Sequence, residues 1–294
     1  QLGVGAGVSG MAYAMSPMQV VAPKDSEEDY LTGIVKIAAG SDHMLALAND
    51  GTVYAWGANT DGQLGTGNYN DSYYPIHVIV NRDPKSEEAV NHAAIGGIVD
   101  VAAGTSFSAL LDENGYVFTF GRNTRGVLGI DYTDSKETLL APNGVPANGY
   151  QQEWVTPVYA PARVLKGAVK AEYEHDLPEK IVDNTRWRET IDRNVYLNNI
   201  VSIAAGESHM VAMDKYGTVY TWGDNTYGQL GIAREGSNDI QYVNTSKNNA
   251  SNFTPKLVPM RAAIDDAWRI YAAGNTTAVI RKDGTLWRSE EHTS

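Results

Sequence analysis

The amino-acid sequence predicts an all-β protein of the β-propeller class, and three observations support this prediction. One segment recurs without gaps at residues 34–57, 98–121 and 200–223. Each copy divides into short runs whose apolar residues alternate or cluster as they do in β-strands. Gly and Asx residues separate these runs where tight turns are needed. Repeated units of four short strands are typical of propeller blades, and the strand pattern excludes a helical solenoid.

The first copy shows the strands in order. Residues 34–39 are predicted to form a first strand that ends in small residues. The apolar run 44–47 forms the second strand, and the pair Asp50-Gly51 makes the hairpin to a third strand at 52–56. Asx-Gly pairs are a strong hairpin signal because both residues accept a positive φ.

A polar, Gly-rich turn follows the third strand at 59–65 and recurs at 123–129 and 225–231. The fourth strand is predicted to begin near a proline, because the missing N–H costs least on the outermost strand of a blade. The prolines assigned to this position are Pro75, Pro161 and Pro255.

A fourth copy at 268–287 is one residue shorter between its two glycines. Repeated glycines are predicted to let backbones pack closely at the end of the first strand; they are Gly40, Gly104, Gly206 and Gly274. Aromatic residues are predicted to enter the core at the end of the third strand; they are Trp56, Trp222 and Trp287, with Phe120 in the second copy.

The combination of Ala-Ala-Gly, a strand such as HMLAL, DGTVYAWG and GANTDGQLG resembles the repeat of the regulator of chromosome condensation family. The resemblance implies a seven-bladed propeller that presents loop surfaces to protein partners. Through the eponymous member it also implies guanine nucleotide exchange on a small nuclear GTPase and chromatin binding. Only about four blades can be counted in this chain, so we interpret it as an incomplete propeller and as a fragment of a larger, bacterial member of the family.

The predicted organisation follows the repeats. Residues 1–23 are the tail of a preceding blade, because they open on the end of a Gly-rich turn and continue into a proline-led strand. The remaining segments are blade repeats at 34–80, 98–165 (with an inserted loop) and 200–260, a charged insertion at 168–199 and a partial repeat at 268–287. The insertion is expected to form a short helix or hairpin.

The last seven residues, 288–294, depart from the repeat, which predicts a glycine after Trp287. The sequence RSEEHTS is also the translation of the start of a widely used sequencing adapter. Our hypothesis is that this tail is not native, and sequencing the source locus across the Trp287 codon tests it.

Composition narrows the classes of partner and chemistry. The formal net charge is −12, with scattered Lys and Arg, which disfavours nucleic acid because such a surface repels phosphates. The absence of cysteine excludes disulfides, thiolate metal sites and a cysteine nucleophile. No apolar run is long enough to span a membrane as a helix. We therefore expect protein partners, no cofactor, no metal and no membrane insertion.

Two repeated features invite a catalytic interpretation. His43 and His209 occupy one repeat position, but Phe107 takes that position in the second copy. A position that accepts Phe favours packing between blades over metal binding or catalysis. The Gly-rich turn lacks the Lys and the strand-to-helix context of a phosphate loop, so we interpret it as a turn.

The inserted segments hold the remaining candidates. Glu172, Glu174, His175 and Asp176 could bind a hard divalent metal, although a solvated charged loop is favoured. Asn244, Asn249 and Asn252 lie in N-x-S/T sequons and are interpreted as solvated loop residues. Aromatic residues on inserted loops are the predicted contact residues for a partner; they are Trp154, Tyr159, Tyr173 and Trp187.

These observations predict a non-enzymatic interaction scaffold, part of a bacterial surface or secreted protein, with an extracellular or cell-surface location favoured. Two alternatives stay open. The first is a guanine nucleotide exchange factor for a small GTPase. The second is a propeller that binds or hydrolyses glycans or peptides through its insertions.

Overall fold

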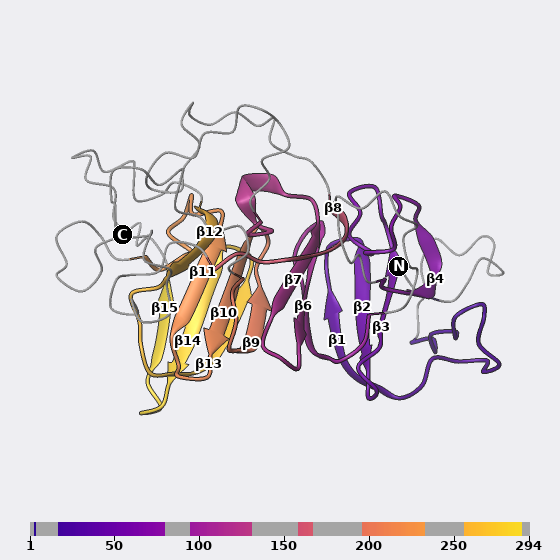
Figure 1. The fold of residues 1–294 in the computed structure, drawn as a ribbon, viewed down its shortest axis with the longest axis horizontal. Coiled ribbons are helices and arrows are strands. Elements are labelled where there is room, and N and C mark those ends of the chain that lie inside the picture. Colours follow the sequence, from indigo (N-terminus) through magenta and orange to yellow (C-terminus); the bar gives the residue numbers. More distant parts are fainter. Residues whose placement is uncertain are drawn as a thin grey trace. The chain divides into compact units, whose positions relative to one another are not determined.

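The computed structural model describes residue 3 and residues 17–79, 95–130, 158–166, 196–232 and 256–289. Within these residues the strands β1 to β15 form four separate antiparallel sheets, which we call blades 1 to 4 (Figure 1). In each blade the strands are neighbours in the order of the sequence, so each blade is a meander. The described residues contain no helix long and apolar enough to cross a membrane.

The strand bounds repeat from blade to blade. Blade 1 contains β1 (Ile34–Ala39), β2 (His43–Ala48), β3 (Val53–Gly57) and β4 (Ser72–His77). Blade 2 contains β5 (Ile98–Ala103), β6 (Phe107–Asp112), β7 (Val117–Gly121) and β8 (Val158–Arg163), with the 3₁₀ turn η1 (Thr124–Gly126) after β7. Blade 3 contains β9 (Ile200–Ala205), β10 (His209–Asp214), β11 (Val219–Gly223) and β12 (Lys256–Arg261). Blade 4 contains only three described strands: β13 (Ala267–Ala273), β14 (Thr276–Arg281) and β15 (Leu286–Ser289).

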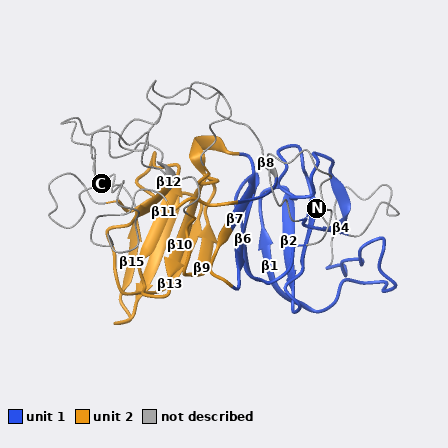
Figure 2. Cartoon of the chain, viewed as in Figure 1, with its two compact units in different colours: residues 1–113, 118–122, 156–162 blue, residues 114–117, 123–155, 163–294 orange. Residues whose placement is uncertain are grey.

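The chain divides into two compact units, coloured separately in Figure 2. Unit 1 comprises residues 1–113, 118–122 and 156–162, and unit 2 comprises residues 114–117, 123–155 and 163–294. Blade 1 and nearly all of blade 2 lie in unit 1, whereas blades 3 and 4 lie in unit 2.

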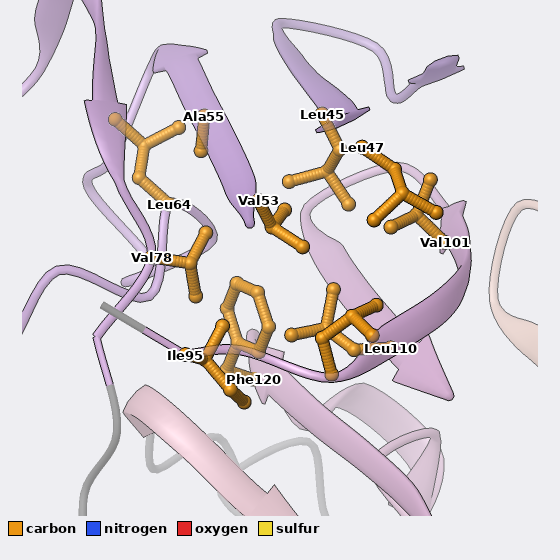
Figure 3. Packing of buried hydrophobic residues seen from close by; sticks show 11 residues of the cluster. Leu45, Leu47, Val53, Ala55, Leu64, Val78, Ile95, Val101, Leu110 and Phe120 are labelled. Carbon is orange, nitrogen blue, oxygen red and sulfur yellow. The ribbon is translucent and has the colours of Figure 1, made fainter. Parts of the chain in front are cut away.

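Each unit has a core made where two successive blades meet. In unit 1, Leu47 and Val53 of blade 1 belong to one buried cluster with Val101, Leu110 and Phe120 of blade 2 (Figure 3). In unit 2 the corresponding cluster joins blades 3 and 4; it contains Val211, Met213, Val219, Ala262, Ala267, Ile270 and Val279. Burial of apolar side chains between blades therefore stabilises each unit.

The strand register corrects the predicted role of Trp287. Trp56 pairs with Met44 in blade 1, but Trp287 pairs with Val279, two positions further along its partner strand. Counted from the hairpin, Trp287 is level with Tyr54, and Ser289 takes the place of Trp56. Trp287 is accordingly exposed, and the prediction that it enters the core was wrong. Because Ser289 is level with Trp56, the repeat's glycine after this strand corresponds to position 290 and not to position 288.

Two further positions differ from the sequence alignment. Gly274 lies in a two-residue turn with a φ of +52°, whereas a positive φ is not found at Gly40. In blade 3, β12 begins at Lys256, directly after Pro255, so the strand starts beside this proline as predicted. By register it is nevertheless Pro259 that is level with Pro75, because Met260 pairs with Thr221 as Ile76 pairs with Ala55 in blade 1.

Several predictions fall outside the described residues. They concern most of the insertion 168–199, the sequons, the acidic cluster at 172–176 and the end of the C-terminal tail. Of that tail, Arg288 and Ser289 end β15. The hypothesis that residues 288–294 are foreign stays a prediction.

Candidate functional site: buried histidine relays and the turn surface

The two repeated histidines are buried at junctions between successive blades. In unit 1, His43 Nε2 lies 2.9 Å from Ser108 Oγ, which donates to the carbonyl of Gln63 at 2.8 Å. A carbonyl can only accept a hydrogen bond, so the Ser108 hydroxyl donates its proton to the Gln63 carbonyl. The Ser108 oxygen must therefore accept a hydrogen bond from His43. The proton of the neutral imidazole is therefore on Nε2. We call this chain of two hydrogen bonds a histidine relay.

Unit 2 repeats the relay with different residues. His209 Nε2 lies 2.9 Å from Thr277 Oγ1, which donates to the carbonyl of Gln229 at 2.7 Å. In each relay the histidine and the carbonyl belong to one blade and the hydroxyl to the next. A relay therefore satisfies buried polar groups across a blade junction, where an unpaired group would be costly.

A third carbonyl of the same kind is satisfied by an indole. Trp222 Nε1 donates at 2.8 Å to the carbonyl of Val127, which occupies the turn position of Gln63. In blade 3 the hydroxyl position holds Met210, so no relay forms there. The turn carbonyl thus receives its donor either from a hydroxyl or from a tryptophan.

Burial keeps both histidines neutral. It lowers the pKa of His43 from 6.5 to about 4, and it lowers the pKa of His209 to about 4 as well. The other ring nitrogen, Nδ1, has no hydrogen-bond partner in either residue. Beside it there is no room for a side chain, because a Cβ on Gly40 would lie 2.4 Å from His43 Nδ1. We propose that these histidines, with the glycines beside them, act in packing between blades.

The Gly-rich turns are held by an asparagine. Asn59 Oδ1 accepts from the Leu64 N–H at 2.9 Å, and its Nδ2 donates to the Asn68 carbonyl at 2.9 Å. Asn123 and Asn225 accept in the same way from the N–H groups of Leu128 and Leu230. All three asparagines are buried. A buried side chain therefore fixes each turn from inside.

Each fixed turn leaves a pair of residues at its tip. The first residue of the pair is always threonine, but the second changes from Asp61 to Arg125 to Tyr227. In unit 2 two tips are joined, because Arg125 bonds both Asp224 and Thr226. Arg125, Thr226 and Tyr227 are exposed, and we call them the turn surface.

Asp224 anchors this surface. Burial alone would raise the pKa of its carboxyl, but hydrogen bonds from Thr226 and Arg125 outweigh that effect and lower it. Asp224 also accepts from the Thr226 N–H at 3.0 Å and from the Thr226 hydroxyl at 2.6 Å. The carboxylate thus holds the guanidinium and the threonine in one arrangement.

The other predicted contact residues are only partly placed. Tyr159 lies in β8, and Trp154, Tyr173 and Trp187 lie outside the described residues. Trp56 and Trp222 are buried, as are Gly104 and Gly206. Among the described residues no group of His, Asp or Glu side chains is arranged to hold a metal.

Sequence reasoning missed Ser108, Thr277 and the link from Arg125 to Asp224. The sequence does contain a signal for Ser108 and Thr277. The residue after the histidine position is Met, Ser, Met and Thr in the four copies, and the hydroxyls occur where the core position of the third strand, taken by Trp56 in blade 1, holds Phe120 or Ser289 instead. The sequence contains no signal for the Arg125–Asp224 ion pair, because its two charges do not recur at the same positions of the other copies.

Comparisons with known proteins match the repeats. One model of the "Regulator of chromosome condensation (RCC1) repeat" matches residues 34–63, 98–127 and 200–229, and a second matches residues 50–111 and 216–280. Together the two models cover more than half of the chain.

Several relatives align over most of the chain. The Protein pim1 of Schizosaccharomyces pombe is 29% identical over 213 residues, which are 69% of this chain and 39% of the relative. The mouse Protein RCC2 is 31% identical over 218 residues, which are 74% of this chain and 34% of the relative. The mouse E3 ubiquitin-protein ligase HERC2 is 26% identical over 257 residues, which are 86% of this chain and 4% of the relative. The chain spans less than half the length of these relatives.

Two solved structures share the fold. A structure of Prp20p from Saccharomyces cerevisiae, a protein with binding properties to Gsp1p and histones, matches with a TM-score of 0.55 and 20% identity, over 91% of this chain and 46% of that one. A structure of yeast RCC1 (Prp20) bound to Kap60 matches with a TM-score of 0.52 and 19% identity, over 91% and 45%. These matches confirm the predicted all-β propeller class. The number of blades stays a prediction.

Proposed function

Because the chain belongs to the regulator of chromosome condensation repeat family, we propose that it is a non-catalytic protein-interaction module. The turn surface, Arg125 with Thr226 and Tyr227, is its proposed contact with a partner. One observation carries this proposal: each turn keeps its buried asparagine and its threonine, while the residue after the threonine changes from the partly exposed Asp61 to the exposed Arg125 and Tyr227. A turn whose asparagine and threonine are constant, but whose next residue varies, is suited to recognising a partner.

The chemistry of the turn surface supports a protein partner. Arginine and tyrosine are enriched among the residues that dominate protein interfaces. Arg125 is held in place by Asp224 before any partner arrives, which lowers the entropy that binding must overcome. The overall charge of −12 favours a partner with a basic contact surface over a nucleic acid.

The relatives support the same class of function. Prp20 has been crystallised in a complex with a protein, Kap60, and Prp20p binds Gsp1p and histones. A protein-binding role is therefore compatible with the family.

The test compares two exposed tyrosines at opposite ends of β11. Tyr227 follows the strand on the turn surface, and Tyr216 precedes it in the hairpin from β10. Partners are captured from cells by crosslinking and quantified for the wild type and for the Tyr227→Ala, Arg125→Ala and Tyr216→Ala variants. We expect a partner that the first two variants lose and the third retains. Equal capture by all four chains would overturn the proposal.

Two assays address the alternative functions. Acceleration of nucleotide release from any member of a panel of small GTPases would replace the scaffold with an exchange factor. Clear hits on a glycan or peptide array, lost on removal of the 168–199 insertion, would favour a ligand-binding propeller.

The cellular setting is proposed from the sequence alone. A bacterial surface or secreted protein is the setting that we propose, whereas the relatives described above come from yeasts and mouse. The full reading frame provides the test, because a signal peptide or wall-anchoring module would support this setting and a nuclear-targeting tail would contradict it.

A further inference from the structure

The hairpin between the second and third strands of a blade is bonded to the blade that follows. In unit 1 the Gly51 carbonyl accepts from the Ile98 N–H at 3.3 Å, and in unit 2 the Gly217 carbonyl accepts from the Ala267 N–H at 3.0 Å. Each bond joins the tip of a hairpin to the first residue of the next first strand. Two residues flank the bond, one before the glycine and one after the strand's first residue, and we call them the flanking pair.

The flanking pair after blade 3 consists of two aromatic residues. The pair is Asp50 with Val99 after blade 1, Asn114 with Val201 after blade 2, and Tyr216 with Trp268 after blade 3. Tyr216 is 64% exposed and Trp268 is 55% exposed. Tyrosine and tryptophan are the residues that most often dominate protein interfaces, so this exposed pair is a candidate contact surface.

The exposure of the flanking pair belongs to its position in the repeat. Val99 and Val201 are 54% and 53% exposed, although further blades come before and after both of them in the chain. Asp50 and Asn114 are exposed as well. Trp268 and Tyr216 are therefore at positions that remain open to solvent when neighbouring blades are present.

Positive charges surround the aromatic pair. The Lys215 Nζ lies 5.2 Å from the centre of the Tyr216 ring, and the guanidinium carbon of Arg269 lies 4.4 Å from that of the Trp268 ring. The Lys282 Nζ donates to the Tyr216 carbonyl at 3.2 Å. We call these five residues the aromatic–basic platform, and they form a local cluster of positive charge in a chain whose net charge is −12.

Backbone bonds hold the platform in place. The Lys215 N–H donates to the Asn199 carbonyl at 3.0 Å, and the Lys282 N–H donates to the Asp266 carbonyl at 2.8 Å. Together with the bond to Gly217, they fix both hairpins to the first strands of blades 3 and 4. A surface that is fixed before binding loses less conformational entropy when a partner arrives.

We propose that the aromatic–basic platform binds a short acidic segment of a partner protein, with an apolar side chain among its carboxylates. The carboxylates pair with Lys215, Lys282 and Arg269, and the apolar side chain packs against Tyr216 and Trp268. This contact goes beyond the turn surface and does not rest on it, because the two surfaces lie at opposite ends of β11.

The charges of the platform favour an acidic protein segment over other ligands. A basic ligand would be repelled, because a cation already lies over each aromatic ring. A nucleic acid carries a phosphate at every nucleotide and would meet the exposed carboxylates of Asp265, Asp266 and Asp283 beside the platform. A short protein segment can place its carboxylates at the three cations alone.

The first experiment identifies the peptides that the platform selects. A random peptide library displayed on phage is bound to the 294-residue chain, and peptides that also bind a Tyr216→Asn, Trp268→Val double variant are removed. The two substitutions copy Asn114 and Val201, so they should preserve the fold. We expect the remaining peptides to carry Asp and Glu on both sides of an apolar residue. A selection that leaves no peptides, or leaves basic ones, would overturn the proposal.

The second experiment measures the affinity of one selected peptide by fluorescence anisotropy. Tyr216→Asn and Trp268→Val should each weaken binding about tenfold or more, as aromatic residues at the centre of an interface do. Lys215→Asn, which copies Asn49, should make binding less sensitive to salt because one screened charge pair is lost. Binding that is insensitive to salt, or equal in all three variants and the wild type, would contradict the proposal.

Two controls separate the platform from other surfaces and other ligands. Tyr73→Ala removes an exposed tyrosine of β4 in unit 1 and should leave the affinity for the peptide unchanged. Single-stranded oligothymidylate, added as a competitor, should not displace the peptide. Displacement by the oligonucleotide at concentrations similar to those of the unlabelled peptide would identify a nucleic-acid surface and overturn the acidic-protein assignment. An equal loss of affinity in Tyr73→Ala would show that the peptide does not bind at the platform.

Discussion

At the scale of single residues, the buried hydroxyl of Ser108 determines how a blade junction satisfies its polar groups. It accepts from His43 and donates to Gln63, so one side chain serves two buried partners. Where the hydroxyl is replaced by Met210, the turn carbonyl is served by Trp222. A blade junction therefore tolerates different residues as long as the carbonyl keeps a donor.

The first prediction concerns this relay. Replacing Ser108 by Ala should lower the free energy of unfolding by about 1–3 kcal/mol, because a buried donor and a buried acceptor lose their partner together. Urea denaturation measures the change. Ser41→Ala, at an exposed position one blade earlier, is the control and should be near neutral. A neutral effect of Ser108→Ala would show that the relay does not stabilise the junction.

The second prediction concerns pH. The unfolded histidines take up protons near pH 6.5, whereas folded His43 and His209 resist protonation down to about 4. Stability from their burial is therefore complete above pH 6.5 and is lost as the pH falls toward 4, by up to about 3 kcal/mol per histidine.

Urea midpoints measured from pH 7 to pH 4 test this dependence. The variant His209→Phe copies the residue found at Phe107 and removes one titrating group. Its stability should fall less steeply over this range than that of the wild type. Parallel pH profiles for the two proteins would contradict the assignment.

At the scale of elements, the Gly-rich turn depends on its asparagine more than on its exposed tip. We predict that Asn59→Ala lowers the free energy of unfolding by about 1–2 kcal/mol, because the Leu64 N–H and the Asn68 carbonyl lose their bonds inside the turn. Thr60→Ala, at the exposed neighbouring position, is the matched control for the same denaturation experiment. Similar losses from both variants would indicate that the turn is held in some other way.

The strands were predictable because their determinants are local. Asx-Gly hairpins such as Asp50-Gly51 and the apolar alternation of residues 52–56 act within a few residues, so the sequence located the elements of the repeat closely. Trp287 was misplaced because register depends on counting from the hairpin, and similarity of residue type at the strand end was a weaker guide.

The candidate site was harder to predict because its contacts join distant segments. His43 meets Ser108, and Arg125 meets Asp224, across 65 and 99 positions of sequence. The residue pattern within one repeat cannot predict contacts between residues of different repeats. They become visible only when the copies are read as neighbours, so that the histidine of one copy is compared with the hydroxyl of the next.

At the scale of the whole molecule, stability should behave as a sum of blades and the contacts between successive blades. We predict that Leu110→Ala, in the cluster that joins blades 1 and 2, costs about 2–5 kcal/mol through the lost burial and the cavity it leaves. Hydrogen exchange should accelerate in β2 and β6, while the amides of β10 and β14 in unit 2 keep their protection.

The matched substitution for this test is Val219→Ala in the cluster of unit 2. It should produce the reverse pattern of exchange. If either substitution accelerated hydrogen exchange equally in both units, the chain would unfold as one cooperative block. That result would contradict a stability that is the sum of blades and of contacts between successive blades.

The unequal exposure of the tryptophans gives the protein optical reporters of its own. Trp56 and Trp222 are buried against glycines of neighbouring turns, whereas Trp268 and Trp287 are 55% and 52% exposed on blade 4. Emission from the first pair should lie at shorter wavelength and resist collisional quenching, and emission from the second pair should be quenched readily. A molecule that settles on blade 4 would shield that second pair, so its arrival could be followed by light alone, without any added label.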